Sequence, residues 1–169
     1  IRVGTPAWIS WNLTITWPRG NAPCPVLLSP DACWPHVVGN EAASSVLRHH
    51  VALAWFDRTE LAFDPDTAQR EGPIFEHWPQ TTAGCIAVWA WGLQRCLDAL
   101  QMINDPRMSC VGTVGHSRGG KAALLAAALD NRFAAAISHN SGTAGAASLA
   151  IHADGAETLA QLQQRFPHW

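Results

Sequence analysis

A serine between two glycines joins a strand pattern to a helix pattern, and this junction constrains the fold more than any other feature of the chain. Gly115-x-Ser117-x-Gly119 follows Ser109–Val114, an apolar run with the composition of a buried strand. It leads at once into Arg118–Leu129, an Ala- and Leu-rich segment with small residues on one helical face. The motif by itself is a weak signal, because small residues are common in loops. Between a strand and a helix, it predicts a tight turn that presents the serine side chain.

The chemistry of this turn explains why each of these residue types is needed. On a strained strand-to-helix turn the Ser117 hydroxyl projects from the sheet, and Gly115 and Gly119 leave room where the two backbones crowd together. The free N–H groups and the positive dipole end of the helix point toward an oxyanion that forms beside the serine. We expect the Arg118 backbone N–H to be one oxyanion donor and the second to come from Ser29–Pro35. These features are those of the nucleophile elbow of α/β-hydrolases.

The rest of the chain alternates apolar strands with helices, which predicts a mostly parallel sheet covered by helices on both faces. Strands are expected at Trp8–Trp17, Val26–Ser29, Val51–Phe56, Ser109–Val114 and Phe133–Ser138, and helices at Glu41–His50, Thr82–Met102, Arg118–Leu129 and Asp154–Gln164. The polar segment Asp57–Gln80 is expected to be a long surface loop. The predicted fold is therefore a single α/β-hydrolase domain over residues 1–169, a three-layer sandwich that is incomplete at its C-terminus.

The charge balance and the lack of long apolar runs exclude some classes of function. The chain has 13 acidic and 11 basic side chains and a formal net charge of −2, which argues against nucleic acid or an anionic membrane surface as the main partner. No apolar run reaches about 18 residues without a charge, so we expect no membrane span. No phosphate loop or dinucleotide motif is present, so we expect no cofactor.

The five cysteines do not form a recognisable site. Their number is odd and no pair has the CxxC spacing of a metal site, so we expect neither a metal nor a catalytic thiol. Cys110 falls on the expected buried strand, where a free thiol behaves as a small apolar side chain. One disulfide stays open as an alternative, either Cys24–Cys33 or a bridge that uses Cys85 or Cys96.

Four regions of the chain together resemble one family. Ser117–Lys121, with Gly115 before it, is similar to the G-x-S-R-x-G-K signature of the glucuronoyl esterases, carbohydrate esterase family 15. Further stretches resemble the same family in the same order: its A-W-A-W-G-L helix at Val88–Leu93, its S-G-x-G-G-A-A loop at Asn140–Gly142 and Gly145–Ala147, and the G-E-T-V … F-P-H-W segment of its bacterial members at Glu157–Thr158 and Arg165–Trp169. The resemblance runs from about Pro25 to the end and is of the bacterial type.

The resemblance implies a function and roles for four side chains. Members of the family hydrolyse the ester between 4-O-methyl-D-glucuronic acid of glucuronoxylan and lignin alcohols. The nucleophile is implied to be Ser117, which forms an acyl-enzyme, and Arg118 is implied to stabilise the oxyanion with its guanidinium. Lys121 is implied to contact sugar hydroxyls, one helical turn from the nucleophile, and Glu157 to line the sugar site.

These assignments have simpler alternatives. Arg118 could be a surface residue that pairs with a nearby carboxylate. Lys121, the only lysine beside ten arginines, could lie on a solvated helix face. Trp89 and Trp91 are two residues apart and cannot share a helix face, so at least one of them is expected in the core rather than in a position that stacks on a sugar.

The catalytic acid and base are where the chain departs from the family. The acid usually follows the strand after the nucleophile, and that slot holds Asn140, which cannot carry the negative charge that stabilises an imidazolium. Bacterial members often place the acid on a later loop, and the catalytic histidine is expected beyond Trp169. Of the histidines present, His116 is expected to be structural, His139 is the best substitute base, and His168 belongs to the F-P-H-W segment.

The chain begins at Ile1 and stops at Trp169 within a helix–turn pattern, so we expect a fragment, the front part of a longer catalytic domain and inactive alone. The first hypothesis is a secreted or periplasmic, monomeric serine esterase of the glucuronoyl type that takes part in lignocellulose degradation. The alternatives are another esterase with the same elbow, of the acetylxylan or dienelactone type, and a catalytically inactive carbohydrate-binding protein. Preference for an acetyl ester would favour the second hypothesis, and ligand binding without turnover the third.

Overall fold

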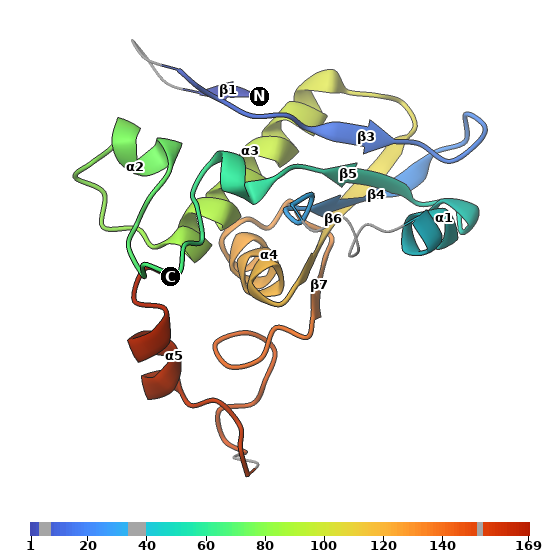
Figure 1. Cartoon of the computed structure of the whole chain (residues 1–169). Coiled ribbons are helices and arrows are strands. Elements are labelled where there is room, and N and C mark those ends of the chain that lie inside the picture. The colour runs from blue at the N-terminus through green and yellow to red at the C-terminus, as the bar shows by residue number, and fades with distance from the viewer. Residues whose placement is uncertain (4–7, 34–39, 152–153) are drawn as a thin grey trace.

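The computed structural model describes residues 1–3, 8–33, 40–151 and 154–169, and Figure 1 shows their arrangement. In chain order the elements are β1 (Arg2–Val3), β2 (Ile9–Ser10), β3 (Thr14–Thr16), β4 (Cys24–Ser29), α1 (Asn40–Arg48), β5 (Ala52–Trp55), the short helix η1 (Arg58–Glu60), α2 (Pro73–His77), α3 (Cys85–Ile103), β6 (Met108–His116), α4 (Arg118–Leu129), β7 (Ala135–His139) and α5 (Leu159–Arg165). The main sheet has the order β3-β5-β4-β6-β7. Strands β5, β4, β6 and β7 run parallel, and β3 pairs antiparallel with β5. The predicted mostly parallel sheet is confirmed.

Helices lie on both faces of this sheet. Successive side chains of a strand point to opposite faces, so one strand can contact both layers of helices. Along β4, Val26 and Leu28 are fully buried in the core to which α3 and α4 contribute. The intervening Leu27 lines a cavity that Ala42 and Val46 of α1 also line. In Figure 1, α3 and α4 lie side by side and α1 lies apart from them, which gives the three layers that the alternation of strands and helices predicted.

The predicted strand Trp8–Trp17 is divided into two short strands, β2 and β3. Between them the Trp11 side chain turns into the core, where it is 3% exposed, and its indole N–H donates to Cys96 Sγ at 3.4 Å. The Trp11 carbonyl accepts from the amino group of Ile1 at 2.9 Å. Burial of the large indole therefore interrupts what the β-rich composition presented as one strand.

The segment Asp57–Gln80, predicted to be a surface loop, contains η1 and α2. The Asp57 carboxylate accepts the Thr59 N–H at 2.8 Å and caps η1. Pro73 is the first residue of α2, a position where its missing N–H costs nothing. The prediction of a loop was wrong for these residues, because two helices of three and five residues are too short to show an apolar period.

The prediction that Cys110 is buried was also wrong. The pairing of β4 with β6 shifts between Cys24 and Val26, and Cys110 falls in this irregularity near the start of β6, where it is exposed. All five cysteines are free, so the structure does not contain the disulfide that was left open.

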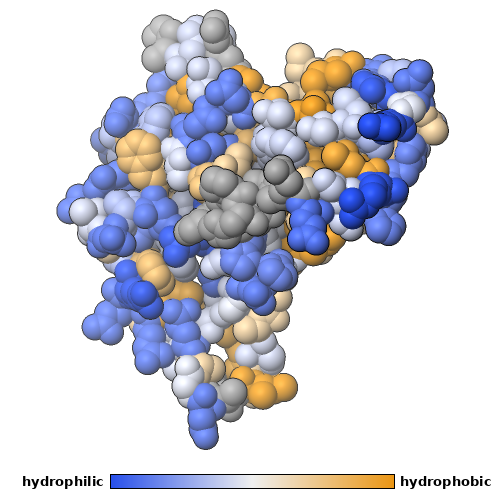
Figure 2. Space-filling view, turned by 45° about the vertical axis from the view of Figure 1, so that its right-hand side comes forward, coloured by the Kyte–Doolittle hydropathy of each residue, from blue (hydrophilic) through white to orange (hydrophobic). Residues whose placement is uncertain are grey.

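The loop between β7 and α5 carries apolar side chains on its surface. Leu149 and Ile151 are 53% and 76% exposed. Figure 2 shows hydrophobic atoms at the lower end of the molecule, where Figure 1 places this loop. Among the described helices, none combines the length and the apolar character that a membrane crossing requires.

Candidate active site

Ser117 is the single residue between the end of β6 and the start of α4. Its backbone has φ 51° and ψ −119°, a conformation that costs a non-glycine residue about 1–3 kcal/mol and must be held by its surroundings. The Ser117 N–H donates to the His139 carbonyl at 2.8 Å, and the Lys121 N–H donates to the Ser117 carbonyl at 3.2 Å. The strained strand-to-helix turn that the sequence predicted is present.

Two glycines make this turn possible, but they face different neighbours. A Cβ at Gly115 would collide with the backbone of Gly119, so strand and helix meet there as predicted. A Cβ at Gly119 would collide with the carboxylate of Asp31. This fully buried carboxylate is paired with Arg58 and accepts the His116 N–H at 2.6 Å. A buried ion pair that no sequence pattern indicated therefore holds the residue before the nucleophile.

The second oxyanion donor was expected within Ser29–Pro35, and part of this stretch is already hydrogen-bonded. The Asp31 N–H donates to Ser29 Oγ at 3.2 Å, and the Ala32 N–H donates to the Phe56 carbonyl at 3.2 Å. Positions 34 and 35 lie outside the described residues. The second donor stays a prediction, and the amides of Asp31 and Ala32 are not candidates for it.

The Arg118 guanidinium lies in a half-enclosed aromatic cluster. It pairs with the Asp64 carboxylate, and the two side chains are 27% and 10% exposed. Its central carbon lies 5.0 Å from the centre of the Trp169 ring and 5.7 Å from that of Phe166. The alternative that Arg118 pairs with a carboxylate is therefore found, although not on an open surface. A paired guanidinium retains other N–H donors, so this ion pair leaves contact with an oxyanion possible.

Asp64 is a functional candidate that sequence reasoning missed. Its carboxylate accepts from Arg118, from Trp169 Nε1 at 2.9 Å and from His168 Nε2 at 3.1 Å. Burial alone would raise the pKa of the Asp64 carboxyl, but these hydrogen bonds hold it below its ordinary value. In Figure 1 the C-terminal end lies beside the loop that contains Asp64. No local motif marks Asp64, because its partners are distant in the sequence.

Lys121 is buried, and its ammonium group faces a loop instead of water. Nζ donates to the Ser141 carbonyl at 2.5 Å and to the Thr143 carbonyl, and it lies 5.7 Å from the centre of the Trp169 ring. Burial lowers the pKa of Lys121, and the nearby Glu157 carboxylate opposes this shift. The Thr143 hydroxyl donates to the Glu157 carbonyl at 2.5 Å, so the loop brings Glu157 toward the lysine. The alternative of a solvated helix face is wrong for Lys121.

The histidines near the elbow contact each other. His116 Nδ1 and His139 Nδ1 are 2.8 Å apart, so one ring donates to the other. Within the described ranges, no histidine forms a hydrogen bond with the Ser117 hydroxyl. The role of His139 as a substitute base thus has no support from the geometry. The same ranges contain no group of three or more His, Cys, Asp or Glu side chains that could hold a metal ion.

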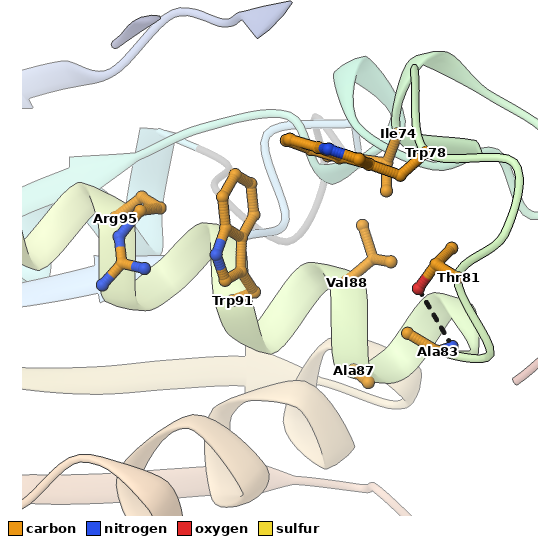
Figure 3. Close-up of a pocket in the computed structure, with 8 residues that line it drawn as sticks. All are labelled: Ile74, Trp78, Thr81, Ala83, Ala87, Val88, Trp91 and Arg95. Carbon is orange, nitrogen blue, oxygen red and sulfur yellow. Dashed lines mark hydrogen bonds between the residues drawn. The ribbon is translucent and has the colours of Figure 1, made fainter. Parts of the chain in front are cut away.

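The two tryptophans of α3 have different surroundings. Trp89 is fully buried, and its indole N–H donates to the Ala62 carbonyl at 2.9 Å, which confirms the core position expected for one of the pair. Trp91 lines a hollow of about 430 Å³ together with Trp78, and the centres of these two rings are 6.2 Å apart. Figure 3 shows Trp78 across the hollow from α3. The elbow residues do not line this hollow.

Comparisons with known proteins agree on the kind of protein that this chain resembles. A family model described as "Glucuronyl esterase, fungi" matches residues 4–166. The 4-O-methyl-glucuronoyl methylesterase of Schizophyllum commune is 32% identical over 141 residues, which make up 81% of this chain and 34% of that protein. Carbohydrate esterase MZ0003, from an unknown prokaryotic organism, is 44% identical over 86 residues, 51% of this chain and 19% of that protein. The chain therefore spans about a third of the length of the first relative and about a fifth of the second.

Solved structures give the same result for the fold. The glucuronoyl esterase of carbohydrate esterase family 15 from Caldicellulosiruptor kristjansonii superposes with a TM-score of 0.79 at 27% identity, over 96% of this chain and 49% of that one. The glucuronoyl esterase from Sporotrichum thermophile has a TM-score of 0.74 at 27% identity, over 99% of this chain and 46% of that one. Together with the parallel sheet and the elbow, these similarities confirm the predicted α/β-hydrolase fold.

Proposed function

Because the chain belongs to the glucuronoyl esterase family, we propose that the protein is a serine carboxylic-ester hydrolase of glucuronoyl esters. Its substrate is the ester between 4-O-methyl-D-glucuronic acid of glucuronoxylan and lignin alcohols. The observation that carries this proposal is the strained conformation of Ser117, at φ 51° between β6 and α4. Arg118 is the next residue and the first of α4. A strained nucleophile at a helix N-terminus is the geometry that acyl transfer requires.

The reaction proceeds in two steps. Ser117 Oγ attacks the carbonyl carbon of the ester while a base accepts the hydroxyl proton, and the carbonyl oxygen becomes an oxyanion. The Arg118 guanidinium and the N-terminus of α4 stabilise this negative charge. The lignin alcohol leaves with a proton, and an acyl-enzyme on Ser117 remains. Water then attacks the acyl group, which releases the glucuronic acid and restores the serine.

Lys121 and Glu157 are assigned to the sugar site. The Lys121 ammonium has three N–H donors, and two of them are used by the carbonyls of Ser141 and Thr143. One donor is left for a sugar hydroxyl. The exposed side chain of Glu157 lies close enough to Lys121 to act on its pKa, so the two charges can bind neighbouring hydroxyls of one sugar.

The catalytic acid and base are assigned to a region of the relatives that this chain does not cover. Support comes from the described histidines, none of which reaches the Ser117 hydroxyl, and from the curated relative of which the chain spans 34%. We also propose that the protein is of the bacterial type, secreted or periplasmic, and monomeric. The 44% identity with a prokaryotic carbohydrate esterase supports the bacterial assignment.

The test compares hydrolysis of a benzyl glucuronate ester and of an acetyl ester by the protein expressed from its complete reading frame. We expect the glucuronate ester to be preferred. Ser117→Ala should lower kcat by at least about 10³-fold, and Ser109→Ala, an exposed serine at the start of β6, should leave it unchanged. Preference for the acetyl ester would assign the protein to another class of esterase. Sugar binding by the wild type without turnover would make it an inactive carbohydrate-binding protein.

A further inference from the structure

The Arg118 side chain is long and flexible, and how well it stabilises an oxyanion depends on how its guanidinium is held in place. A free arginine samples many rotamers, and ordering it costs up to about 2 kcal/mol. A charge that must meet one developing oxygen atom acts best when it is already fixed in place. We propose that Asp64 is a positioning residue that fixes the Arg118 guanidinium beside Ser117, and this inference rests on the proposed function.

The Asp64 carboxylate is itself fixed through both of its oxygens. Oδ2 accepts from Arg118 Nη1, and Oδ1 accepts from Trp169 Nε1 at 2.9 Å and from His168 Nε2 at 3.1 Å. The side chain is 10% exposed, so little water competes for these bonds. A carboxylate bonded at both oxygens cannot rotate without breaking contacts, and it therefore offers the guanidinium a single orientation.

Aromatic rings hold the guanidinium in a second way. The Phe166 and Trp169 rings are stacked, with centres 3.9 Å apart and an angle of 2° between planes, and Arg118 lies over both rings. Arginine can make cation–π contacts and an ion pair at the same time, because its planar guanidinium carries several N–H donors. The Arg118 side chain as a whole remains 27% exposed, so it is not sealed from a substrate.

The segment that supplies these rings is tied to the main fold. The Cys85 N–H at the start of α3 donates to the His168 carbonyl at 2.8 Å. A Cβ at Gly84 would collide with the Trp169 carbonyl, so the backbones are in direct contact there. The C-terminal segment is thus anchored to the N-terminus of α3 and carries His168 and Trp169 onto Asp64. Folding of the whole domain orders Arg118 before any substrate binds.

A double-mutant cycle separates positioning from a purely structural role, and it is measured on the protein from its complete reading frame. We expect Asp64→Asn to lower kcat about tenfold with KM changed by less than about twofold, because the guanidinium acts on the transition state. Arg118→Ala should lower kcat by about 10²–10³-fold. Adding Asp64→Asn to Arg118→Ala should have no further effect, and Asp64→Glu should restore most of the activity. The control is Asp105→Asn, whose ion pair with Arg107 precedes β6, and it should not change kcat.

The cycle can fail in definite ways. Equal losses from Asp64→Asn in the wild-type and Arg118→Ala backgrounds would overturn the proposal, and so would a change in KM alone. Circular dichroism shows whether each variant folds. If Asp64→Asn does not fold, Trp169→Phe replaces it, because it keeps an aromatic ring beside Arg118 while it removes the N–H donor to Asp64 together with part of the indole. Its expected loss of about fivefold, the value of one hydrogen bond, must also vanish in the Arg118→Ala background.

A second readout does not depend on esterase activity. Phenylglyoxal modifies free guanidinium groups, and mass spectrometry reports the rate at Arg118. We expect the rate to rise several-fold in Asp64→Asn and to stay unchanged in Asp105→Asn. If Asp64→Asn reacts faster at Arg118 than the wild type does, but the wild type shows no esterase activity, the proposed function is rejected and the positioning role is kept. An unchanged rate at Arg118 would reject the positioning role.

Discussion

Two arginine–aspartate pairs contact the nucleophile elbow, and their surroundings differ. Arg58 and Asp31 are 2% and 0% exposed. Asp31 accepts the His116 N–H at 2.6 Å, and Arg58 lies 4.9 Å from the centre of the Trp89 ring. Every contact of this pair lies inside the fold, so the pair acts on the backbone that carries the nucleophile.

The second pair keeps one partner within reach of solvent. Asp64 is 10% exposed and held by Trp169 and His168, whereas Arg118 is 27% exposed and lies over aromatic rings. A charge that shapes the backbone can be sealed completely. A charge that is to meet a substrate needs an open side and must be held from the other side. The difference in burial between the two arginines therefore separates a structural ion pair from one that can serve a reaction.

The largest expected effect comes from breaking the sealed pair. Arg58→Met leaves the Asp31 carboxylate buried without its counter-ion, and we expect the free energy of unfolding to fall by about 3–5 kcal/mol. Urea denaturation of the protein from its complete reading frame measures this loss. Asp105→Asn, which breaks the partly exposed pair with Arg107, is the control and should cause a much smaller loss. A loss for Arg58→Met no larger than that of a surface pair, about 1 kcal/mol or less, would contradict the role assigned to Asp31.

A smaller effect tests the contact between Asp31 and the elbow helix. Replacement of a helical glycine by alanine ordinarily stabilises by about 1 kcal/mol. At Gly119 the new methyl group would collide with the Asp31 carboxylate, and overpacking costs about 1–3 kcal/mol. The balance of the two terms is a loss of up to about 2 kcal/mol, which we expect for Gly119→Ala in urea denaturation. In Gly112→Ala the new Cβ meets its neighbours at 3.4 Å or more, and this control should stay close to the wild type. A more stable Gly119→Ala protein would show that Asp31 can move aside.

The next effect concerns the loop that Lys121 holds. Lys121→Met keeps an unbranched side chain that is one heavy atom shorter, but leaves the Ser141 and Thr143 carbonyls without their donor, which costs about 1–2 kcal/mol. We expect faster hydrogen exchange in residues 140–147 without any substrate present. Gln94→Met removes a longer bond, 3.4 Å, to the Ala126 carbonyl between α3 and α4, and should leave exchange in this loop unchanged. Equal exchange in wild type and Lys121→Met would leave Lys121 with a substrate role alone.

The elbow could be predicted from the sequence because its signals are local. The helix has the predicted bounds Arg118–Leu129, and β6 contains the whole of the predicted strand. The ion pairs around the elbow could not be predicted in this way. Asp31 and His116 are 85 residues apart, and Asp64 and Trp169 are 105 apart. No helical or strand period connects residues at such separations, so only the fold reveals these contacts.

The smallest expected effect distinguishes the two aspartates by pH. Burial raises the pKa of Asp31 in spite of the nearby Arg58. For Asp64 burial acts in the same direction, but hydrogen bonds led by that from Trp169 outweigh it and lower the pKa. A carboxyl whose pKa is lowered on folding stabilises the folded state at pH values above the ordinary pKa of 3.8. This stabilisation is lost as the pH falls through the pKa of the folded state. A raised pKa has the opposite sign, so the contribution of Asp31 is present below 3.8 and is lost as the pH rises through its folded value.

Stability measured from about pH 5 to about pH 3 should therefore respond in opposite ways to the two substitutions. With each curve set to its own value at the upper pH, Asp64→Asn should fall less steeply toward acid than the wild type, and Asp31→Asn should fall more steeply. Asp105→Asn removes another carboxyl with a lowered pKa, of about 2, so it shows how much flattening a partly exposed pair away from the elbow produces. If Asp64→Asn flattens the curve no more than this control, hydrogen bonds to the ionised carboxylate do not stabilise the cluster. Arg118 would then be held by the Phe166 and Trp169 rings alone, and the contrast between the two ion pairs would reduce to a difference in burial.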